Sequence, residues 1–304
     1  MTASQPPHDE SPAGTGGRPL PGAPLDTTAQ LMNAITSRLG TQLSLVSLNG
    51  TRRPAPPPLV LVAHGSRDPR ALDTVSTLAE RVRELRPHLP VRLGHLELDE
   101  PLLPAALASI DTARDPRAVL VPLLLSRGHH VKRDVPAAVA AVPGLRARVA
   151  APLGPHPLLV ETLYARLVEA GWRTRMSDAA RRASGVVLAA AGSRDPDAAV
   201  DTRRTAGLLA ERLGVPVTAA YASAAAPTVP AAVRAMAARG RHRIAVASYF
   251  TAPGRFATAC AGAAPWIAAA PLGTHPAMAR LVLHRYDQAL AAPEPAFARE
   301  LAAT

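Results

Sequence analysis

Short apolar runs alternate with segments of helical periodicity over most of this chain. Four apolar runs in the first half predict strands, at residues 58–63, 91–98, 117–125 and 146–151. The segments between and after them predict helices, at residues 70–86, 101–110 and 157–171. Asp134 and Pro136 are typical of the cap and first turn of one more helix. This alternation predicts a parallel sheet with helices on both faces.

The same plan occurs a second time along the chain. Four anchors recur in the same order, namely Gly-Ser-Arg-Asp-Pro at 65–69 and 192–196, a proline pair at 101 and 104 and at 227 and 230, a glycine at 128 and 254, and Pro-Leu-Gly-x-His-Pro at 152–157 and 271–276. Such repetition predicts two copies of one α/β unit. The expected fold class is therefore α/β, with two tandem domains, each a mainly parallel sheet flanked by helices, and a cleft between them.

These patterns divide the chain into five expected segments. Residues 1–57 and 293–304 are predicted to be disordered or flexible tails, and the first of them is rich in Pro, Gly, Ser and Thr. The two domains are expected over residues 58–173 and 185–292, joined by a linker over residues 174–184.

Composition narrows the class of protein. Of the 304 residues, 48% are hydrophobic and only 3% aromatic, so the core must consist of Ala, Leu and Val. The net charge of +11 comes almost wholly from arginine, since Lys132 is the only lysine, and no nucleic-acid-binding motif accompanies it. We therefore expect an acidic small molecule, and no nucleic acid, as partner.

Cys260 is the only cysteine, which excludes an intrachain disulfide framework and a cysteine-based metal site. Without a bilayer-spanning run or a signal-peptide pattern, we expect a cytoplasmic protein with no membrane partner.

The second copy provides an internal control for chemistry, because residues kept in both copies are expected to serve the fold. Three polar residues of the first copy are lost together in the second, where His64, Glu97 and His130 correspond to Ala191, Ser223 and Phe256. Each of the three follows a different predicted strand, at the edge where open parallel sheets bind ligands. Two imidazoles and a carboxylate at one edge predict a divalent transition-metal site with open positions.

Other candidates are assigned to the fold. The repeated Gly-Ser-Arg-Asp-Pro segment is interpreted as a turn followed by a helix cap, and anion binding through its backbone N–H groups is the alternative. His156 and His275 are kept in both copies, so we expect structural roles for them. His129 is a weaker candidate than His130 because Arg255 stands at its position in the second copy.

Three motifs of the first half resemble those of a known family. They are His64-Gly-Ser-Arg67, His95-Leu-Glu-Leu-Asp-Glu-Pro101, and an apolar strand followed by His130-x-x-x-Asp134-Val-Pro136. Together and in this order they are similar to the class II tetrapyrrole chelatases that act on sirohydrochlorin, of the CbiX/SirB type, over about residues 58–165. The second half resembles a degenerate copy, as in two-domain members. The departures are His95 where the family has Phe, and Val135 where it has Ile.

The resemblance implies a metal chelatase, a lyase that inserts a divalent metal into sirohydrochlorin without ATP. The family's metal contacts fall on His64, Glu97 and His130, which we also expect to be catalytic. We expect the two histidines to hold the metal and to accept the pyrrole protons, with Glu97 as a third ligand or a base. The metal is a substrate, and no tightly bound cofactor is expected. Fe²⁺, giving siroheme, is the expected metal, and cobalt insertion toward cobalamin is the alternative.

The resemblance also implies that the substrate is an acidic small molecule with several carboxylates. The polar residues beside the proposed ligands are candidates to bind it, namely Ser66, Arg67, Arg127, Lys132 and Arg133. The second half is expected to form the other wall of the cleft, with Arg194 and Arg255 facing in. A non-catalytic metal or tetrapyrrole carrier is the alternative from another class, whereas an α/β-hydrolase would need a Gly-x-Ser-x-Gly motif that the chain lacks. The sequence leaves the oligomeric state open, and two fused copies are consistent with a monomer.

Overall fold

Residues 55–293 are the part of the chain that this computed structural model describes. The chain divides into two units, Met1–Ala55 and Pro56–Thr304, and the second unit contains all the described helices and strands. The tails predicted over residues 1–57 and 293–304 lie outside the described residues, apart from their inner ends, which contain no helix or strand. Within the described part, no helix is both long and apolar enough to cross a bilayer.

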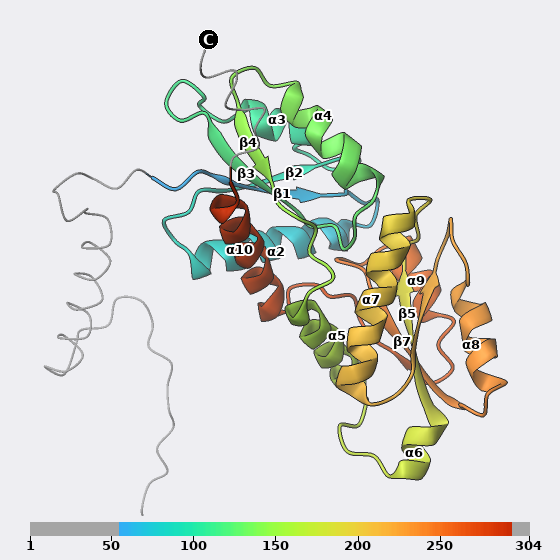
Figure 1. The fold of residues 1–304 in the computed structure, drawn as a ribbon. Coiled ribbons are helices and arrows are strands. Elements are labelled where there is room, and N and C mark those ends of the chain that lie inside the picture. Colours follow the sequence, from blue (N-terminus) through green and yellow to red (C-terminus); the bar gives the residue numbers. More distant parts are fainter. Residues whose placement is uncertain (1–54, 294–304) are drawn as a thin grey trace, which may run out of the picture. The chain divides into compact units, whose positions relative to one another are not determined.

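The first repeat forms a four-stranded parallel sheet (Figure 1). Its strands β1 (Leu59–Ala63), β2 (Val91–His95), β3 (Arg117–Pro122) and β4 (Arg146–Val149) lie in the order β2-β1-β3-β4. The helices between them are α2 (Pro69–Leu85), α3 (Leu103–Ala108) and α4 (Val135–Ala140), which follows a short π-helix, η1 (His130–Asp134). Strand β2 ends earlier than predicted because the left-handed backbone of Leu98, with φ of 69°, belongs to a turn that leaves the sheet.

The second repeat forms a parallel sheet of the same order, β6-β5-β7-β8. Its strands are β5 (Ser184–Ala190), β6 (Val217–Tyr221), β7 (Arg243–Tyr249) and β8 (Ile267–Ala268), and its helices are α7 (Pro196–Leu213), α8 (Val229–Ala237) and α9 (Arg255–Ala261). A further helix, α6 (Asp178–Ala183), lies within the predicted linker and is capped by Ser177. The predicted α/β class, with two tandem parallel sheets flanked by helices, is confirmed.

Along the central strands, successive side chains point to opposite faces of the sheet, and both faces are buried. In β1, Leu59 and Leu61 belong to the apolar cluster that includes α2, whereas Val60 and Val62 pack with Leu103 of α3. Every residue of β1 is buried. Burial on both faces explains why this strand is an unbroken apolar run in the sequence.

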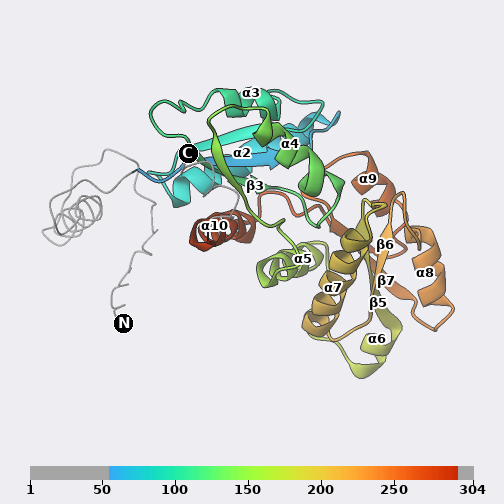
Figure 2. The same cartoon turned by 45° about the horizontal axis from the view of Figure 1, so that its top comes forward.

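The last helix of each repeat packs on the other repeat. Helix α5 (Pro157–Glu169) contacts α7 and β7, and helix α10 (Pro276–Ala291) contacts α2, β3 and β4. Figures 1 and 2 show α10 beside α2 and α5 beside α7. Side chains of both repeats therefore share one apolar core, which includes Leu59 of β1 and Tyr286 of α10.

The repeated sequence motifs start helices. In both exchanged helices, Nδ1 of the capping histidine, His156 or His275, accepts a hydrogen bond from the backbone N–H two residues further on. Asp68 and Asp195 cap α2 and α7 in the same way, each followed by proline at the first helical position. The structural roles predicted for the Gly-Ser-Arg-Asp-Pro turn and for both histidines are confirmed.

Candidate functional site

The three residues singled out by the repeat lie at one edge of the first sheet. His64 follows β1 directly, Glu97 lies two residues beyond β2, and His130 begins η1 in the connection after β3. In the order β2-β1-β3-β4, the chain leaves β1 and β3 toward opposite faces of the sheet. The carboxyl ends of two such strands border the crevice in which open α/β sheets bind their ligands. His64 and His130 follow these two strands and lie on either side of this crevice.

The side chains of these residues approach one another. The imidazole rings of His64 and His130 lie edge to face, with centroids 4.6 Å apart. Nδ1 of His64 lies 3.3 Å from Oε1 of Glu97. The three side chains are between 40 and 54% exposed, so a metal ion and a large substrate can reach them from solvent.

A close contact between two loops fixes this geometry. Gly65 has φ of 98°, and a Cβ at this position would lie 1.7 Å from the carbonyl oxygen of Glu97. The backbone N–H of Glu97 donates to the carbonyl of His64 at 3.0 Å, and that of Ser66 donates to the Asp99 carboxylate at 2.9 Å. Any residue other than glycine at position 65 would push apart the loops that carry His64 and Glu97.

Asp134 is a site residue that the sequence interpretation missed. Asp134 takes the N-cap position of α4 as predicted, but its carboxylate makes no capping hydrogen bond and lies 2.6 Å from Nδ1 of His130 instead. The other carboxylate oxygen lies 3.6 Å from Nε2 of His129. Since residues 130–134 already form a π-helix, Asp134 stands inside a helical segment and not at its start. The His-x-x-x-Asp spacing is the signal that identifies such a pair, because it places two side chains about one turn apart.

The site consists of two imidazole–carboxylate pairs. Glu97 faces Nδ1 of His64 and Asp134 faces Nδ1 of His130, which leaves Nε2 of each ring as the nitrogen for a metal ion. Among residues 55–293, no three or more His, Cys, Asp or Glu side chains gather as a metal-binding group. The structure thus brings the predicted trio together through two contacts, His64 with His130 and His64 with Glu97. Two imidazoles can hold an ion and leave positions open for a substrate.

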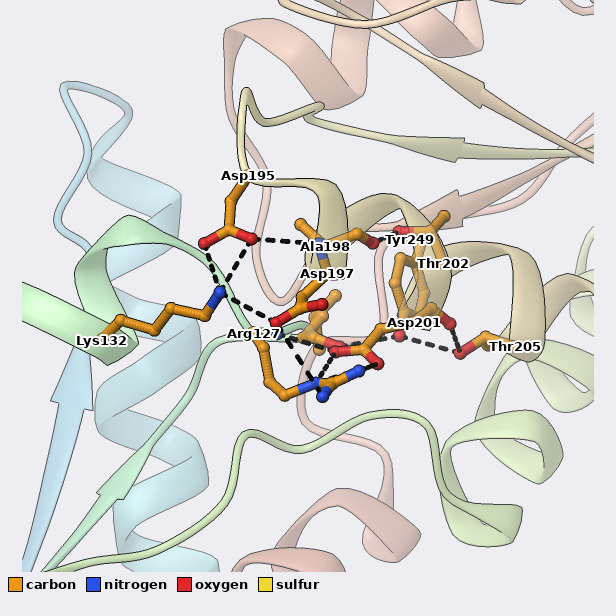
Figure 3. A network of polar contacts seen from close by, with 10 residues as sticks. Arg127, Lys132, Asp195, Asp197, Ala198, Asp201, Thr202, Thr205 and Tyr249 are labelled. Atoms are coloured by element: carbon orange, nitrogen blue, oxygen red, sulfur yellow. Dashed lines mark hydrogen bonds and ion pairs between the residues drawn. The ribbon is translucent and has the colours of Figure 1, made fainter.

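Two of the predicted substrate-binding cations are engaged by the second repeat (Figure 3). Arg127 pairs with Asp201 at 2.8 Å, and Lys132 pairs with Asp195 and Asp197 at 2.7 and 2.9 Å. Hydrogen bonds to these carboxylates raise the pKa of Arg127 and of Lys132, and the ammonium of Lys132 lowers the pKa of Asp195. Both cations are therefore already paired with aspartates, which reduces the positive charge that a substrate carboxylate would meet there.

The other predicted substrate-binding residues lie close to the histidines in sequence, Ser66 and Arg67 after β1 and Arg133 within η1. Ser66 belongs to the turn, where its hydroxyl accepts a hydrogen bond from the N–H of Asp68 at 3.1 Å. Arg67 and Arg133 are exposed, and the side chain of neither forms an ion pair or hydrogen bond with another residue in the described range. These two arginines are therefore open to an acidic ligand.

A pocket of about 580 Å³ adjoins the histidine segment and involves both repeats. It is lined by His129, Lys132, Ser193, Arg194, Asp195 and Pro196. Arg194 thus faces a pocket shared by the two repeats, as expected from the sequence. The guanidinium of Arg255, in contrast, lies over the ring of Phe256 at 4.9 Å from its centroid.

The second repeat keeps the loops of this site without its polar groups. Gly192 has φ of 93°, and a Cβ there would lie 1.8 Å from the carbonyl oxygen of Ser223, as at Gly65. By the register of the repeat, His64, Glu97, His130 and Asp134 correspond to Ala191, Ser223, Phe256 and Cys260. The second sheet therefore offers the same edge with neither imidazole nor carboxylate at these positions.

Comparison with known proteins identifies relatives of both repeats. A family model described as CbiX matches residues 58–170 and 185–289. The sirohydrochlorin cobaltochelatase of Methanococcus aeolicus is 35% identical over 78 residues, which cover 26% of this chain and 54% of that protein. The sirohydrochlorin ferrochelatase of Bacillus subtilis is 28% identical over 164 residues, which cover 52% of this chain and 59% of that protein. The chain thus spans little more than half the length of these curated relatives.

Solved structures share the same fold. One described as SirB from Bacillus subtilis with Fe3+ superposes with a TM-score of 0.61 at 22% sequence identity, over 77% of this chain and 95% of that chain. At this identity the likeness concerns the fold alone. It agrees with the two parallel sheets described above.

Proposed function

We propose, from the premise that this chain belongs to the CbiX family, that it inserts a divalent metal ion into sirohydrochlorin without ATP. The observation that carries the proposal is the contact between the imidazoles of His64 and His130, 4.6 Å apart at the carboxyl edge of the first sheet. The repeat supports it, because these side chains are kept only where the carboxylates that face them are also kept. The names of the two curated relatives are consistent with this reaction.

The reaction requires that two pyrrole N–H protons leave the macrocycle as one divalent ion enters it. In the starting complex, Nε2 of His64 and Nε2 of His130 bind the ion, and its other positions are open to pyrrole nitrogens. As bonds form between the metal and the macrocycle, each imidazole releases the metal and accepts one of the two protons. Two protons replace one divalent ion, so the total charge held at the site does not change.

The two carboxylates make this exchange favourable. Glu97 at Nδ1 of His64 and Asp134 at Nδ1 of His130 stabilise each imidazole when it becomes an imidazolium. They also fix the ring orientation, so that Nε2 points to the metal. In this proposal Glu97 acts through His64, and its expected role as a third metal ligand or base stays a prediction.

The substrate would bind through its carboxylates. Arg67 and Arg133 are exposed beside the histidines, and Arg194 lines the shared pocket. Imidazole ligands suit both Fe²⁺ and Co²⁺, so the predicted preference for iron stays a prediction, with cobalt as the alternative. A cytoplasmic location and a monomeric state belong to the same proposal.

The test measures the disappearance of metal-free sirohydrochlorin by its visible absorption, with Fe²⁺ or Co²⁺ and with the uncatalysed rate subtracted. His64→Ala and His130→Ala are each expected to lower kcat/KM by at least about 100-fold, because each removes a ligand and a proton acceptor. Ser223→Ala, at the second-repeat position that corresponds to Glu97, is the matched control and should keep the wild-type rate. Wild-type rates in both histidine variants would contradict the roles assigned here. A wild-type chain that binds metal and macrocycle without joining them is a carrier.

A further inference from the structure

We propose that three aspartates of the second repeat position the histidine segment of the first. The aspartates are Asp195, Asp197 and Asp201 at the start of α7, and their partners, Arg127 and Lys132, stand on either side of His130 in the sequence (Figure 3). This inference rests on the proposed function, because it gives the repeat that lacks the metal ligands a part in metal insertion. The three aspartates are positioning residues, since they act through Arg127 and Lys132.

Arg127 is held through both its backbone and its side chain. Its backbone N–H donates to Oδ2 of Asp201 at 2.9 Å, and its guanidinium donates to the same carboxylate from Nε at 3.0 Å and from Nη2 at 2.8 Å. The side chain of Asp201 is only 4% exposed, so water screens this pair less than a pair on the surface. A two-point contact to a buried carboxylate fixes the direction of the chain as well as its position.

Uncharged hydrogen bonds hold the same segment where it leaves β3. The hydroxyl of Thr251 donates to the carbonyl of Leu123 at 2.8 Å, and that of Tyr249 donates to the carbonyl of Leu125 at 2.9 Å. The second repeat therefore holds the segment at four successive points, Leu123, Leu125, Arg127 and Lys132. His130 lies between the last two of these.

The repeat shows that the charged contacts of Arg127 and Lys132 have no counterpart at the corresponding positions around the second sheet. The counterparts of Arg127 and Lys132 in the second repeat are Pro253 and Thr258, which carry no charge. In α2, a threonine at position 74 replaces Asp201, and Asp68, the counterpart of Asp195, pairs with Arg70 of its own helix at 2.6 Å. Contacts that served only to join the repeats would have no reason to be limited to the side that carries the histidines.

Loss of these contacts should act on metal binding before it acts on folding. His64 and His130 bind one ion together only while their rings stay close, and small displacements of catalytic groups cost large factors in rate. We expect Asp201→Asn to weaken Co²⁺ binding and to lower kcat/KM for metal insertion, each by about 10-fold, as for other residues that orient metal ligands. Lys132→Met, at an exposed position where misfolding is not expected, should show a smaller effect in the same direction.

The experiment measures Co²⁺ affinity from the visible absorption of the protein-bound ion, without macrocycle, and the melting temperature of each variant. Asp287→Asn is the matched control, because it removes a two-point contact of the same kind, from Arg86 to Asp287 at 2.6 and 2.9 Å, that joins α2 to α10 at a distance from the histidines. The expected result is weaker Co²⁺ binding in Asp201→Asn and Lys132→Met and unchanged binding in Asp287→Asn, whatever its melting temperature.

Two results would overturn the inference. One is wild-type Co²⁺ affinity in Lys132→Met together with wild-type affinity in any folded Asp201→Asn. The other is an equal loss of affinity in Asp287→Asn, which would mean that any contact between the repeats has this effect. Failure of the wild-type chain to insert metal would reject the proposed function, and the Co²⁺ affinities would still decide the role of the aspartates.

Discussion

The carboxyl edges of the two sheets can be compared residue by residue. The first carries His64, Glu97, His130 and Asp134, and the second carries Ala191, Ser223, Phe256 and Cys260. The turns beneath are the same, since Gly65 and Gly192 both have positive φ and both lie against the next loop. The fold is therefore stable without the polar side chains, and their presence in one repeat calls for a reason other than folding.

The segment after the third strand of each sheet also differs. In the first repeat it is the π-helix η1, in which the carboxylate of Asp134 reaches Nδ1 of His130. In the second repeat it is the α-helix α9, which begins directly after Gly254. The π-helix is the less favourable form and is frequent at functional sites, so its occurrence in the repeat with the histidines agrees with the proposed chemistry.

The largest expected effect is on stability and comes from the apolar core that the two repeats share. Leu281 of α10 is fully buried in the core common to both repeats, so Leu281→Ala should lower the free energy of unfolding by about 2–5 kcal/mol. Trp172 and Trp266, whose rings lie 5.7 Å apart, report on the contact between the repeats by fluorescence. We expect the fluorescence and far-ultraviolet circular dichroism transitions to coincide and to shift together. Two separate transitions would show that the repeats unfold independently.

The next effect tests the difference between the repeats. Asp134→Asn and Glu97→Gln each leave an imidazole without an anionic partner, and each should lower kcat/KM for metal insertion by about 10–100-fold. Cys260→Ala changes the position that corresponds to Asp134 and should leave the rate unchanged. Equal rates for Asp134→Asn and the wild type would show that the Asp134 carboxylate has no part in the mechanism.

The sequence predicts the elements of this fold well because each sheet is buried on both faces. The apolar run of β1 and the repeated caps at Asp68 and Asp195 mark strands and helix starts directly. The exchange of α5 and α10 could not be predicted, because periodicity shows which residues of a helix are buried and not which sheet covers them. A helix of the right length fits either sheet when the two have the same order.

The sequence predicts only part of the candidate site. His64, Glu97 and His130 were found because their loss in the second repeat is visible in the sequence. Asp134 was missed because aspartate before Val-Pro has the pattern of a helix cap, and only the π-helix reveals its other use. The pairing of Arg127 with Asp201 joins residues of different repeats, and no local pattern predicts it.

A smaller effect concerns the histidines that both repeats keep. Burial, with the positive charges of Arg285 and His284 nearby, lowers the pKa of His156 from 6.5 to about 4. Burial also lowers the pKa of His275. As the pH falls from 6.5 to about 4, the unfolded chain therefore binds protons that the folded chain does not, and stability decreases across this range.

His156→Asn isolates this contribution, because asparagine caps a helix without titrating. Melting temperatures at pH 7 and pH 4.5 should show a smaller decrease on acidification in His156→Asn than in the wild type. An identical decrease in both proteins would mean that other groups account for the acid sensitivity. The same comparison at His275 tests whether the two caps behave alike.

The smallest expected effect concerns a matched pair of positions with strained backbones, one in each repeat. Glycine substitutions there test the backbone strain separately from the role of the side chain. Leu98 and Ala224 both have left-handed backbones, with φ of 69° and 57°. This conformation costs about 1–2 kcal/mol for a residue other than glycine, and the entropic cost of glycine offsets about half of it. Ala224→Gly and Leu98→Gly should therefore each raise the free energy of unfolding by about 0.5–1 kcal/mol.

Only one of these two glycine substitutions, Leu98→Gly, should affect substrate binding. Leu98 is 55% exposed beside Glu97, where an apolar side chain can contact a macrocycle, whereas alanine stands at the matching place in the second repeat. We expect Leu98→Gly to raise KM for sirohydrochlorin and Ala224→Gly to leave it unchanged. A rise in both variants would assign the effect to the loops and not to the leucine.

The place of α10 along the chain affects how the protein is made. It is the last helix of the described residues, yet it covers the face of the first sheet to which Leu59 and Leu61 belong. While the ribosome is still translating the second repeat, that face has no helix α10 to cover it. The first repeat can reach its final packing only after residues 276–291 have left the exit tunnel. Splitting the gene between the repeats would give two products, each of which carries the helix that covers the other.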